Sequence, residues 1–383
     1  MQKAKLIRIT TVPVSLDKLL EGQLHFMSEQ YEVTAISAEE NGYLQRIAER
    51  EKVGFYPIEL TRAITPFADL KALWKMYRFL RKEKPLIVHS HTPKAGTVGM
   101  MAAKLAGVPI RLHTVAGLPL MEVSGNKRKL LNAVEKITYA CATKVLPNSE
   151  GLKKIIVDQG FCQENKLKVI GKGSSNGIDT HYFDPNLFSE ITKANLRQKW
   201  NISTEDFVYV FVGRIVKDKG IIELIKAFSS ITDLKTKLLL VGSFEQELDP
   251  LPQEILDEIQ SNPRIIHVGW QSDVRPFLSI SHVLTFPSYR EGFPNVVMQA
   301  GAMELPAIVT DINGCNEIIT THENGIIIPV KSRVELSDAM RLLLENKQLY
   351  AELKSKTRKI IEENYRREYI WYELQKFYSE EIK

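Results

Sequence analysis

Residues 287–311 read PSYREGFPNVVMQAGAMELPAIVTD, and this stretch decides the fold. It continues the apolar run VLTFP into a charged turn that carries Glu291 and Gly292. An amphipathic run comes next, and a second apolar run, AIVT, then ends at Asp311. Buried strands that alternate with helices are typical of a parallel sheet with helices on both faces. The stretch therefore predicts one strand–turn–helix–strand repeat of an α/β fold.

The same repeat recurs along the 383 residues of the chain. Apolar runs predict further strands, among them AKLIRIT, YEVTAIS, PLIVHSH, PIRLHTV, ATKVLPNS, FVYVFVGR, KLLLVGS and RIIHVG. The length and the two series of strands favour two doubly wound, Rossmann-like α/β domains that face each other across a deep cleft. A turn-rich segment, residues 176–185, marks the boundary. We predict domains of residues 1–183 and 184–365, and a C-terminal helix, residues 366–383, that packs back across them.

Composition excludes several classes of protein. An apolar content of 44% and a charged content of 25% are ordinary for a globular protein. The N-terminus lacks the apolar segment of a signal peptide, and no run approaches the ~20 apolar residues of a membrane span. The three cysteines, Cys141, Cys162 and Cys315, lack metal-site spacing. We expect a cytoplasmic protein with reduced thiols.

The net charge of +5 is unevenly distributed along the sequence. Residues 1–183 hold 27 Lys and Arg against 17 Asp and Glu, whereas the remaining residues hold 24 against 29. A basic first half predicts an anionic partner, either membrane phosphates or a lipid-linked diphosphate. Nucleic acid is disfavoured because no nucleic-acid-binding motif is present. The basic helices expected at residues 74–84 and 126–136 fit a membrane surface, although solvated helix faces have the same composition.

Two cations follow the first strand of the second half. In FVGRIVKDKG, Arg214 and Lys219 stand near Gly213 and Gly220, just past the strand's carboxyl end. Fixed cations at this position neutralise a diphosphate and stabilise it as a leaving group. Loop cations are more often simply solvated.

The helix expected after Gly292 strengthens this interpretation. A helix beginning near Asn295 offers free backbone N–H groups to a phosphate. Glu291 in the turn is placed to accept hydrogen bonds from sugar hydroxyls, and Gln299 lies eight residues further on. Eight helical residues span ~12 Å, which suits a nucleotide sugar. Alternatively, Glu291 only favours the helix dipole and Gln299 is a surface residue.

The segments GRIVKDKG, EGFPNVVMQAGA, LPAIVTDINGCNEII and NGIIIPV resemble the donor half of retaining GT-B glycosyltransferases, glycosyltransferase family 4. The resemblance covers essentially the whole chain. It implies an N-terminal acceptor-binding domain and a C-terminal nucleotide-sugar donor domain. It also implies that Arg214 and Lys219 hold the diphosphate and that Glu291 contacts the transferred sugar. The family's second glutamate, which binds ribose, is replaced here by Gln299, which predicts weaker ribose binding. The remaining donor-site residues that we predict are Gly213, Gly269, Trp270, Gly292, Phe293, Asn295 and Val296.

The first half, with VHSHTPKAGTVGMMAAKLAGVPIRLHTVAGL, resembles bacterial enzymes that build O-antigen, capsule or other lipid-linked glycans. His113 matches a family histidine near the transferred sugar, although an isolated histidine at a strand end is more often structural. Lys94 and Arg111 are our candidates for binding an acceptor phosphate. We expect His89, His91 and Lys94 to face the same cleft. The family's Gly-Gly turn after the first strand is replaced here by TTVPVS.

The resemblance therefore predicts transfer of a sugar, with retention at the anomeric carbon, from a UDP-sugar to a polyprenyl-diphosphate-linked sugar. UDP-N-acetylgalactosamine is the first choice of donor, with other UDP-hexoses close behind. We expect His113, Arg214, Lys219 and Glu291 to be catalytic, with no metal and no other cofactor. The expected location is the inner face of the bacterial cytoplasmic membrane, with peripheral attachment to its anionic surface. Two alternatives remain open, a UDP-sugar epimerase or hydrolase of the same fold and a non-catalytic nucleotide-sugar-binding protein. A dehydrogenase is disfavoured because no G-x-G-x-x-G follows a strand.

Overall fold

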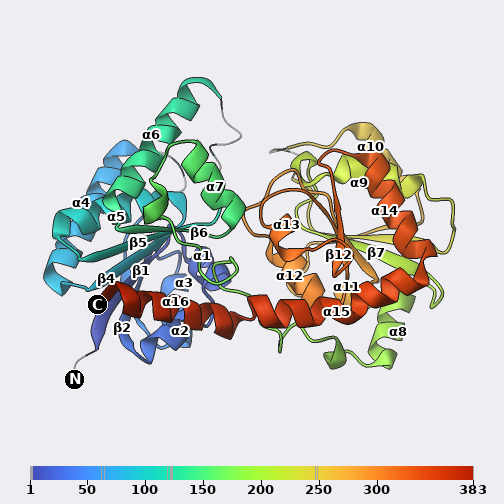
Figure 1. Ribbon diagram of the computed structural model, residues 1–383, viewed down its shortest axis with the longest axis horizontal. Helices are drawn as coiled ribbons and strands as arrows, with labels where there is room; N and C mark the ends of the chain where they lie inside the picture. The colour runs from blue at the N-terminus through green and yellow to red at the C-terminus, as the bar shows by residue number, and fades with distance from the viewer. Residues whose placement is uncertain are drawn as a thin grey trace. The chain divides into compact units, whose positions relative to one another are not determined.

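The computed structural model of the protein describes residues 3–61, 63, 65–118, 120, 124–245, 247 and 249–382. The chain forms two compact units (Figure 1). Unit 1 consists of Met1–Asn176 and Glu368–Lys383, and unit 2 of Gly177–Arg367. Each unit contains one six-stranded sheet whose strands all pair in parallel. The predicted class, two doubly wound α/β domains, is confirmed.

Unit 1 alternates strands and helices from its first residues. Its elements are β1 (Ala4–Ile9), α1 (Pro13–Leu19), α2 (Gln23–Ser28), β2 (Tyr31–Ser37), α3 (Tyr43–Glu51), β3 (Gly54–Pro57), α4 (Pro66–Glu83), β4 (Ile87–His91), α5 (Pro93–Ala106), β5 (Ile110–Val115), α6 (Gly125–Cys141), β6 (Lys144–Pro147), α7 (Glu150–Asp158), the 3-10 helix η2 (Glu164–Lys166) and α16 (Arg367–Ile382).

The sheet of unit 1 is buried on both faces, as the continuous apolar runs of its strands require. Successive side chains of β1 enter different cores: Leu6 packs on one face, and Ile7 and Ile9 pack on the other. Figure 1 shows α4, α5 and α6 over one face of the sheet and α2, α3 and α16 over the other. The strand order β3-β2-β1-β4-β5-β6 reverses direction between β1 and β4.

Unit 2 repeats the plan with shorter connections. Its elements are the 3-10 helix η3 (Pro185–Leu187), α8 (Glu190–Lys199), β7 (Phe207–Val212), the 3-10 helix η4 (Lys217–Lys219), α9 (Ile221–Ser229), β8 (Thr236–Val241), α10 (Gln253–Ser261), β9 (Ile265–Gly269), α11 (Arg275–Ser279), β10 (Val283–Phe286), α12 (Asn295–Ala302), β11 (Ala307–Thr310), α13 (Cys315–Ile318), β12 (Gly325–Ile328), α14 (Arg333–Glu345) and α15 (Lys347–Tyr365).

The centre of the unit 2 sheet is formed by β7 and β10. The strand order is β12-β11-β10-β7-β8-β9, so the direction of the chain across the sheet reverses between these two strands. All four residues of β10, and all but the first of β7, are buried. Buried central strands cannot shift their register without losing core contacts, because every residue packs on one face or the other. The loops that follow β7 and β10 therefore start from fixed points.

The division between the units differs from the boundaries expected at residues 183/184 and 365/366. Residues 177–183 lie with unit 2 because they pair with the end of α15. The backbone N–H of Ile178 donates to Tyr365 at 2.8 Å, and the N–H of Arg367 donates to Ile178 at 3.0 Å. The guanidinium of Arg367 also pairs with Asp179 at 3.1 Å. The turn-rich composition around this segment gave the approximate position, but not the contacts that set the division.

The C-terminal helix α16, dark red in Figure 1, is part of unit 1 from Glu368 onward. The apolar stripe expected from the sequence, Ile370, Trp371, Leu374 and Phe377, is buried together with Tyr378. Leu374, Phe377 and Tyr378 belong to the apolar core that α16 shares with β1 and β5. A helix that follows unit 2 in sequence thus completes the fold of unit 1.

Candidate active site

The carboxyl ends of β7 and β10 lie where the strand order of unit 2 reverses. Loops that leave two adjacent strands toward opposite sides of a parallel sheet open a crevice, and this is where such folds bind ligands. The loop after β7 carries Arg214 and Lys219, and the loop after β10 carries Glu291. Three residues predicted from two separate sequence segments therefore start from one point of the sheet.

Lys219 and Glu291 meet at this point. The Nζ atom of Lys219 lies 2.5 Å from Oε1 of Glu291, and the two side chains are 14% and 17% exposed. Ser288 Oγ donates a second hydrogen bond to the same carboxylate oxygen at 3.1 Å. The ammonium is suited to binding an anion, and the carboxylate to accepting hydrogen bonds from hydroxyls. Both groups are held in place and remain partly accessible to solvent.

The turn around Glu291 is fixed by the loop that follows β11. Asn313 Nδ2 donates to the carbonyl oxygens of Glu291 and, at 3.2 Å, of Gly292. The neighbouring Gly314 has φ +77°, and a Cβ there would lie 2.6 Å from the carbonyl oxygen of Gly292. Only glycine tolerates both this conformation and this approach. Three consecutive carboxyl-end loops of the sheet therefore meet at the turn.

A second set of contacts joins the β7 and β10 loops directly. Arg290 pairs with Asp218 at 2.7 Å, and the backbone N–H of Tyr289 donates to the Asp218 carbonyl at 2.9 Å. Gly220, with φ +70°, lies so close that a Cβ would be 2.0 Å from the carbonyl oxygen of Pro287. Asp218 immediately precedes Lys219, and Arg290 immediately precedes Glu291. These contacts between the two loops consequently hold Lys219 and Glu291 close together.

Helix α12 begins directly after the turn. Its first residue is Asn295, its N-cap is Pro294, and no side chain forms a cap hydrogen bond there. Uncapped N–H groups at a helix start are suited to binding a phosphate. Asn295 is exposed and Val296 is half-buried, whereas the buried ring of Phe293 lies 5.6 Å from that of Tyr365. Phe293 is thus at least a packing residue of the turn.

Gln299 is half-buried in the second turn of α12. The spacing between Glu291 and Gln299 is not helical throughout, because the helix begins only at Asn295. The expected span of eight helical residues was wrong in this respect. The first half of the interval is the turn itself, whose path is set by Asn313.

Arg214 lies on the same edge but has a different partner. Its guanidinium pairs with Glu245 in the loop after β8 at 3.0 Å, and its side chain is exposed. The backbone around it is compact, since a Cβ on Gly242 would lie 1.8 Å from the carbonyl oxygen of Gly213. Arg214 is therefore near the crevice, but its ion pair with Glu245 must break before it can bind an anionic ligand.

Gly269 and Trp270 extend the edge to β9. Gly269 is the last residue of β9, has φ +74°, and accepts a hydrogen bond from the N–H of Gly242 at 2.9 Å. Trp270 follows with its side chain 71% exposed. An exposed indole at a ligand-binding edge offers a flat face on which a base can stack. The donor-site role of Gly269 and Trp270 stays a prediction.

The histidines of unit 1 form a buried network beneath α16. His89 Nδ1 lies 2.5 Å from the Tyr378 hydroxyl, and its Nε2 lies 2.7 Å from Thr114 Oγ1. His91 Nε2 lies 2.9 Å from a guanidinium nitrogen of Arg8, which can only donate. Burial, and then the charge of Arg8, hold the pKa of His91 well below its usual value. The expectation that both histidines face an open cleft was wrong, since each is buried inside unit 1.

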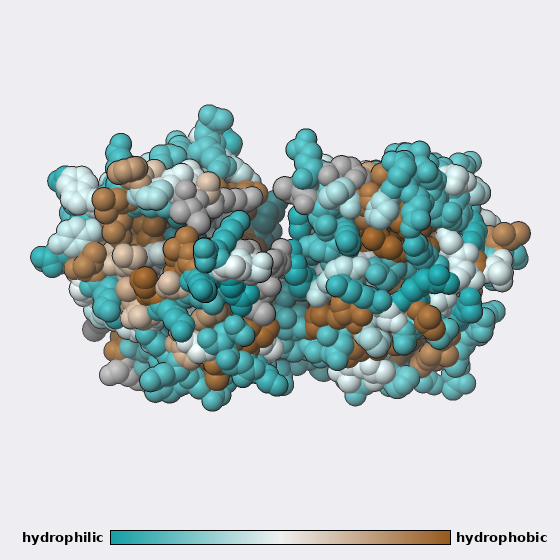
Figure 2. Space-filling model, turned by 90° about the horizontal axis from the view of Figure 1, so that it is seen from above, coloured by the Kyte–Doolittle hydropathy of each residue, from teal (hydrophilic) through white to brown (hydrophobic). Residues whose placement is uncertain are grey.

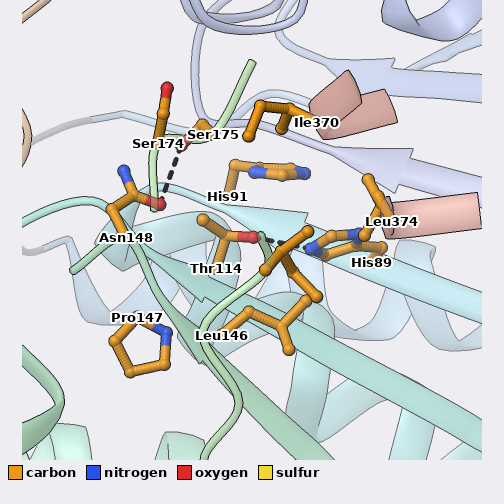
Figure 3. Close-up of a pocket in the computed structure, with 11 residues that line it drawn as sticks. His89, His91, Thr114, Leu146, Pro147, Asn148, Ser174, Ser175, Ile370 and Leu374 are labelled. Carbon is orange, nitrogen blue, oxygen red and sulfur yellow. Dashed lines mark hydrogen bonds between the residues drawn. The ribbon is translucent and has the colours of Figure 1, made fainter. Parts of the chain in front are cut away.

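A small polar cavity adjoins this network, and Figure 3 shows the residues that line it. Asn148 accepts a hydrogen bond from Ser175 at 3.0 Å, and Ser174 lies beside them. Leu374 and Ile370 of α16 close the apolar side. The cavity measures about 20 Å³, which is enough for one water molecule but too small for a sugar or a phosphate. It is therefore not an acceptor site in this conformation.

His113 lies within β5, as the predicted run PIRLHTV indicates. Strand β5 continues to Val115, and His113 pairs in register with Ser90 of β4. Its ring is 2.9 Å from Ser90 Oγ, and a Cβ on Gly96 of α5 would lie 2.3 Å from the ring. Burial lowers the pKa of His113 to about 4. The imidazole is therefore neutral and buried beneath α5, and its role toward a sugar remains a prediction.

Lys94 and Arg111 are separated, contrary to their prediction as a pair. Lys94 lies in the first turn of α5, at the carboxyl edge of the sheet, and forms an ion pair with Asp69. Arg111 pairs in register with Val88 near the opposite edge. Its guanidinium donates to the carbonyls of Val108 and Cys141 at 2.6 and 2.7 Å. Arg111 is thus a structural residue, and only Lys94 is placed to meet a ligand.

Several site residues could not be found from the sequence. Ser288, Asn313, Asp218 and Arg290 act through contacts between loops that are far apart in the chain. The available signal was their position, because each follows the carboxyl end of a central strand. Among the described residues, no three His, Cys, Asp or Glu side chains are grouped as a metal site requires. None of the described helices has the length and apolar character of a membrane span.

Comparison with known proteins identifies the family. Residues 24–173 match the glycosyl transferase 4-like domain, and residues 192–360 match glycosyl transferases group 1. The capsular polysaccharide biosynthesis glycosyltransferase CapM of Staphylococcus aureus is 35% identical over all of this chain and 99% of its own length. The chain belongs to the group 1 glycosyltransferases. The enzyme is thus a hexosyltransferase, as the sequence resemblance implied.

Other relatives of this glycosyltransferase have more specific names. The Escherichia coli UDP-Gal:alpha-D-GlcNAc-diphosphoundecaprenol alpha-1,3-galactosyltransferase is 29% identical over 87% of this chain and 85% of its own length. The Campylobacter jejuni N,N'-diacetylbacillosaminyl-diphospho-undecaprenol alpha-1,3-N-acetylgalactosaminyltransferase is also 29% identical, over 76% of each chain. Among solved structures, Anabaena Alr3699/HepE in complex with UDP has a TM-score of 0.82 at 17% identity and covers 98% of the glycosyltransferase and 100% of its own chain. The fold is therefore shared along the whole chain.

Proposed function

We propose that this glycosyltransferase moves a sugar from a UDP-sugar to a polyprenyl-diphosphate-linked sugar, with retention, in the assembly of capsule, O-antigen or a related glycan. The observation that carries the proposal is the pair Lys219 and Glu291 at the point where the strand order of unit 2 reverses. An uncapped helix start beside a lysine is suited to a diphosphate, and the carboxylate to a hexose. The two named relatives that act on diphosphoundecaprenol-linked sugars support the acceptor class.

The chemistry follows from these positions. The acceptor hydroxyl oxygen bonds to the anomeric carbon on the face from which UDP departs, while the bond between that carbon and the UDP β-phosphate oxygen breaks. The departing phosphate takes the proton of the hydroxyl. Lys219 and the N–H groups at the start of α12 stabilise the charge that develops on the diphosphate. Glu291 holds the transferred sugar through its hydroxyls, and the exposed indole of Trp270 supports the uracil.

The donor proposed first is UDP-N-acetylgalactosamine, followed by UDP-galactose. The Campylobacter relative is named for transfer of the first sugar, and the Escherichia relative for transfer of the second. Purified enzyme should be incubated with each UDP-sugar and a lipid-linked acceptor, and products identified by mass spectrometry. The proposal predicts one donor that extends the acceptor by one sugar. UDP-sugar breakdown without acceptor would instead indicate a hydrolase, and binding without turnover a non-catalytic protein.

We also propose that transfer needs no metal ion and takes place at the inner surface of the cytoplasmic membrane. The proposed donor contacts are a lysine, backbone N–H groups and hydroxyl-binding side chains, and none of these requires a cation as intermediary. Transfer should continue in excess EDTA, and its loss there would contradict metal independence. The basic character of the first half of the chain supports the membrane location.

A further inference from the structure

Helix α4 exposes three large apolar side chains on one face. Phe67, Leu70 and Trp74 are 93%, 64% and 57% exposed, and their spacing of three and four residues places them side by side along the helix. The opposite face of α4, with Met76 and Leu80, is buried in the core over the unit 1 sheet. Figure 2, which looks onto the side of α4, α5 and α6, shows brown apolar residues among teal ones on unit 1, at the left. Isolated exposed apolar residues are common, but a continuous stripe of aromatic and leucine side chains marks an interaction surface.

The charges of α4 are sorted by face. Its exposed cations are Lys71, Lys75, Arg78, Arg81 and Lys82. Its two carboxylates point elsewhere: Asp69 forms an ion pair with Lys94, and Glu83 forms one with Lys5 at 2.7 Å. The outer face of α4 is therefore apolar in its N-terminal half and basic from Lys71 onward, and neither carboxylate of α4 lies on it.

We propose that this face, made of Phe67, Leu70, Trp74 and the five exposed cations, docks on a bilayer that contains anionic phospholipid. Aromatic and leucine side chains between lysines and arginines are the composition of helices that lie in a membrane interface. The guanidinium of Arg78 lies over the Trp74 ring, 4.6 Å from its centroid, so charge and apolar surface coincide at one place. A bilayer satisfies both at once, because its headgroups meet the cations while its acyl boundary receives the rings.

The first turn of α4 also contacts Lys94, the residue still proposed for the acceptor phosphate. Asp69 lies in this turn on the side away from the docking face, and its carboxylate holds the Lys94 ammonium at the carboxyl edge of the sheet. A polyprenyl chain that leaves the bilayer at this stripe brings its diphosphate within reach of Lys94, which then exchanges Asp69 for phosphate. This step rests on the proposed sugar transfer, whereas docking itself deepens the proposed membrane location and is testable without transfer.

Vesicle flotation tests the docking face with the full chain. The probes are vesicles of phosphatidylglycerol mixed with phosphatidylcholine, and vesicles of phosphatidylcholine alone. The wild-type protein should float with the first and remain unbound with the second. Two variants should each weaken binding at least about tenfold. The first combines Phe67→Ser, Leu70→Ser and Trp74→Ser, and the second combines Lys71→Glu and Arg78→Glu. Brominated lipids should quench the fluorescence of Trp74, and this quenching should disappear in Trp74→Phe.

The matched control is Ile191→Ser with Leu234→Ser, which removes two exposed apolar side chains of unit 2. This control should float like the wild type, and both α4 variants should keep wild-type thermal stability because the changed side chains are exposed. Unchanged flotation of the triple serine variant would overturn the proposal. Equal binding to both kinds of vesicle would also overturn it, as would binding only to an added acidic protein.

Kinetics separates the docking face from the proposed function. With acceptor in anionic vesicles, Lys94→Ala should raise KM for the acceptor about tenfold while KM for the UDP-sugar and flotation stay unchanged. Lys94→Arg should restore most of the acceptor affinity, which a purely structural role would not require. If the enzyme transfers sugar to a detergent-dispersed acceptor, and the α4 substitutions leave flotation with vesicles unchanged, only the docking face is refuted. If α4-dependent flotation holds and no transfer occurs with any donor, only the proposed function fails.

Discussion

At the scale of single residues, the ion pair between Lys219 and Glu291 keeps both charges compensated before a ligand binds. The two side chains are mostly but not fully buried, so each alone would lose hydration without a partner. A diphosphate and a sugar would replace this mutual contact with two separate ones, because the phosphate attracts the ammonium and the hydroxyls reach the carboxylate. If the proposed donor site is correct, the pair is its ligand-free form, which ligand binding would open.

Lys219→Ala should lower kcat/KM for transfer by about 100- to 1,000-fold, because it removes a charge aimed at the leaving diphosphate. Glu291→Gln should lower it by a similar order, since a neutral amide accepts sugar hydroxyls less strongly. Steady-state kinetics with a saturating acceptor measures both. The control is Lys226→Ala, which breaks an exposed pair with Glu254 in the same unit and should leave kinetics unchanged. Near-normal transfer by Lys219→Ala would remove this lysine from the site.

Asn313→Ala should reduce kcat about tenfold and leave the fold intact, because it frees the carbonyls of Glu291 and Gly292 from the donor that holds the turn. Asn316→Ala is the matched control, since this exposed amide at the start of α13 donates to the Asp311 side chain and not to the turn. Both variants should melt within a few degrees of the wild type. If the two asparagine variants lose activity equally, the contact to the turn is not what positions Glu291.

The sequence singled out Lys219 and Glu291, which the structure brings into contact, but not the residues that position them. Both follow an apolar strand by a few residues and stand beside glycines, which is a local signal. Asn313 and Asp218 act on turns that are distant in sequence, and only the order of the strands brings those turns together. The position of Arg111 was mispredicted for a related reason. Which edge of the sheet a cation within a strand lies near is known only once the strand register is known.

At the scale of elements, α16 is the clearest case in which the sequence predicted a helix but not its place in the fold. Its amphipathic stripe predicted a packed helix, but not the unit on which it packs. The choice follows from polar contacts inside unit 1: Tyr378 reaches His89, and the indole N–H of Trp371 donates to Asn176 at 2.6 Å. The end of β5, by contrast, agrees with the sequence. The predicted run PIRLHTV reaches Val115, where β5 ends in its pairing with β6.

Tyr378→Phe should destabilise unit 1 by about 1–2 kcal/mol, because it leaves a ring nitrogen of the buried His89 without its partner. Urea unfolding followed by circular dichroism measures the change. Tyr372→Phe on the same helix is the control and should have no effect, since that side chain is exposed. Deleting residues 368–382 should prevent unit 1 from folding, because five buried side chains of α16 are lost together. A deletion variant with a cooperatively folded unit 1 would show that α16 only covers a complete core.

At the scale of the whole molecule, the two units differ in how many buried histidines they contain. His89, His91 and His113 are buried in unit 1, whereas His282 in unit 2 is half-buried. Burial lowers the pKa of all four, to about 4 for His113 and His282, against an ordinary value of 6.5. Their nitrogens accept hydrogen bonds that a proton would remove, as at His91 beside Arg8 and at His282, which accepts from the Val208 N–H at 2.9 Å.

Unit 1 should therefore lose stability faster than unit 2 as the pH falls below about 6.5. Below pH 6.5 the unfolded chain binds protons at these histidines, whereas the folded chain does not. Their contribution to the free energy of unfolding is therefore present above pH 6.5 and decreases as the pH falls toward 4. From pH 6.5 to 5.5 each histidine should cost about 1 kcal/mol, hence about 2–3 kcal/mol in unit 1 and about 1 kcal/mol in unit 2. Glu135 offsets part of the loss in unit 1, because burial raises its pKa. Hydrogen exchange, corrected for intrinsic rates and compared between peptides of β4–β5 and of β7–β10, measures each unit separately. His113→Gln should flatten the response of unit 1 alone, and an equal decline in both units would show that these histidines do not control acid stability.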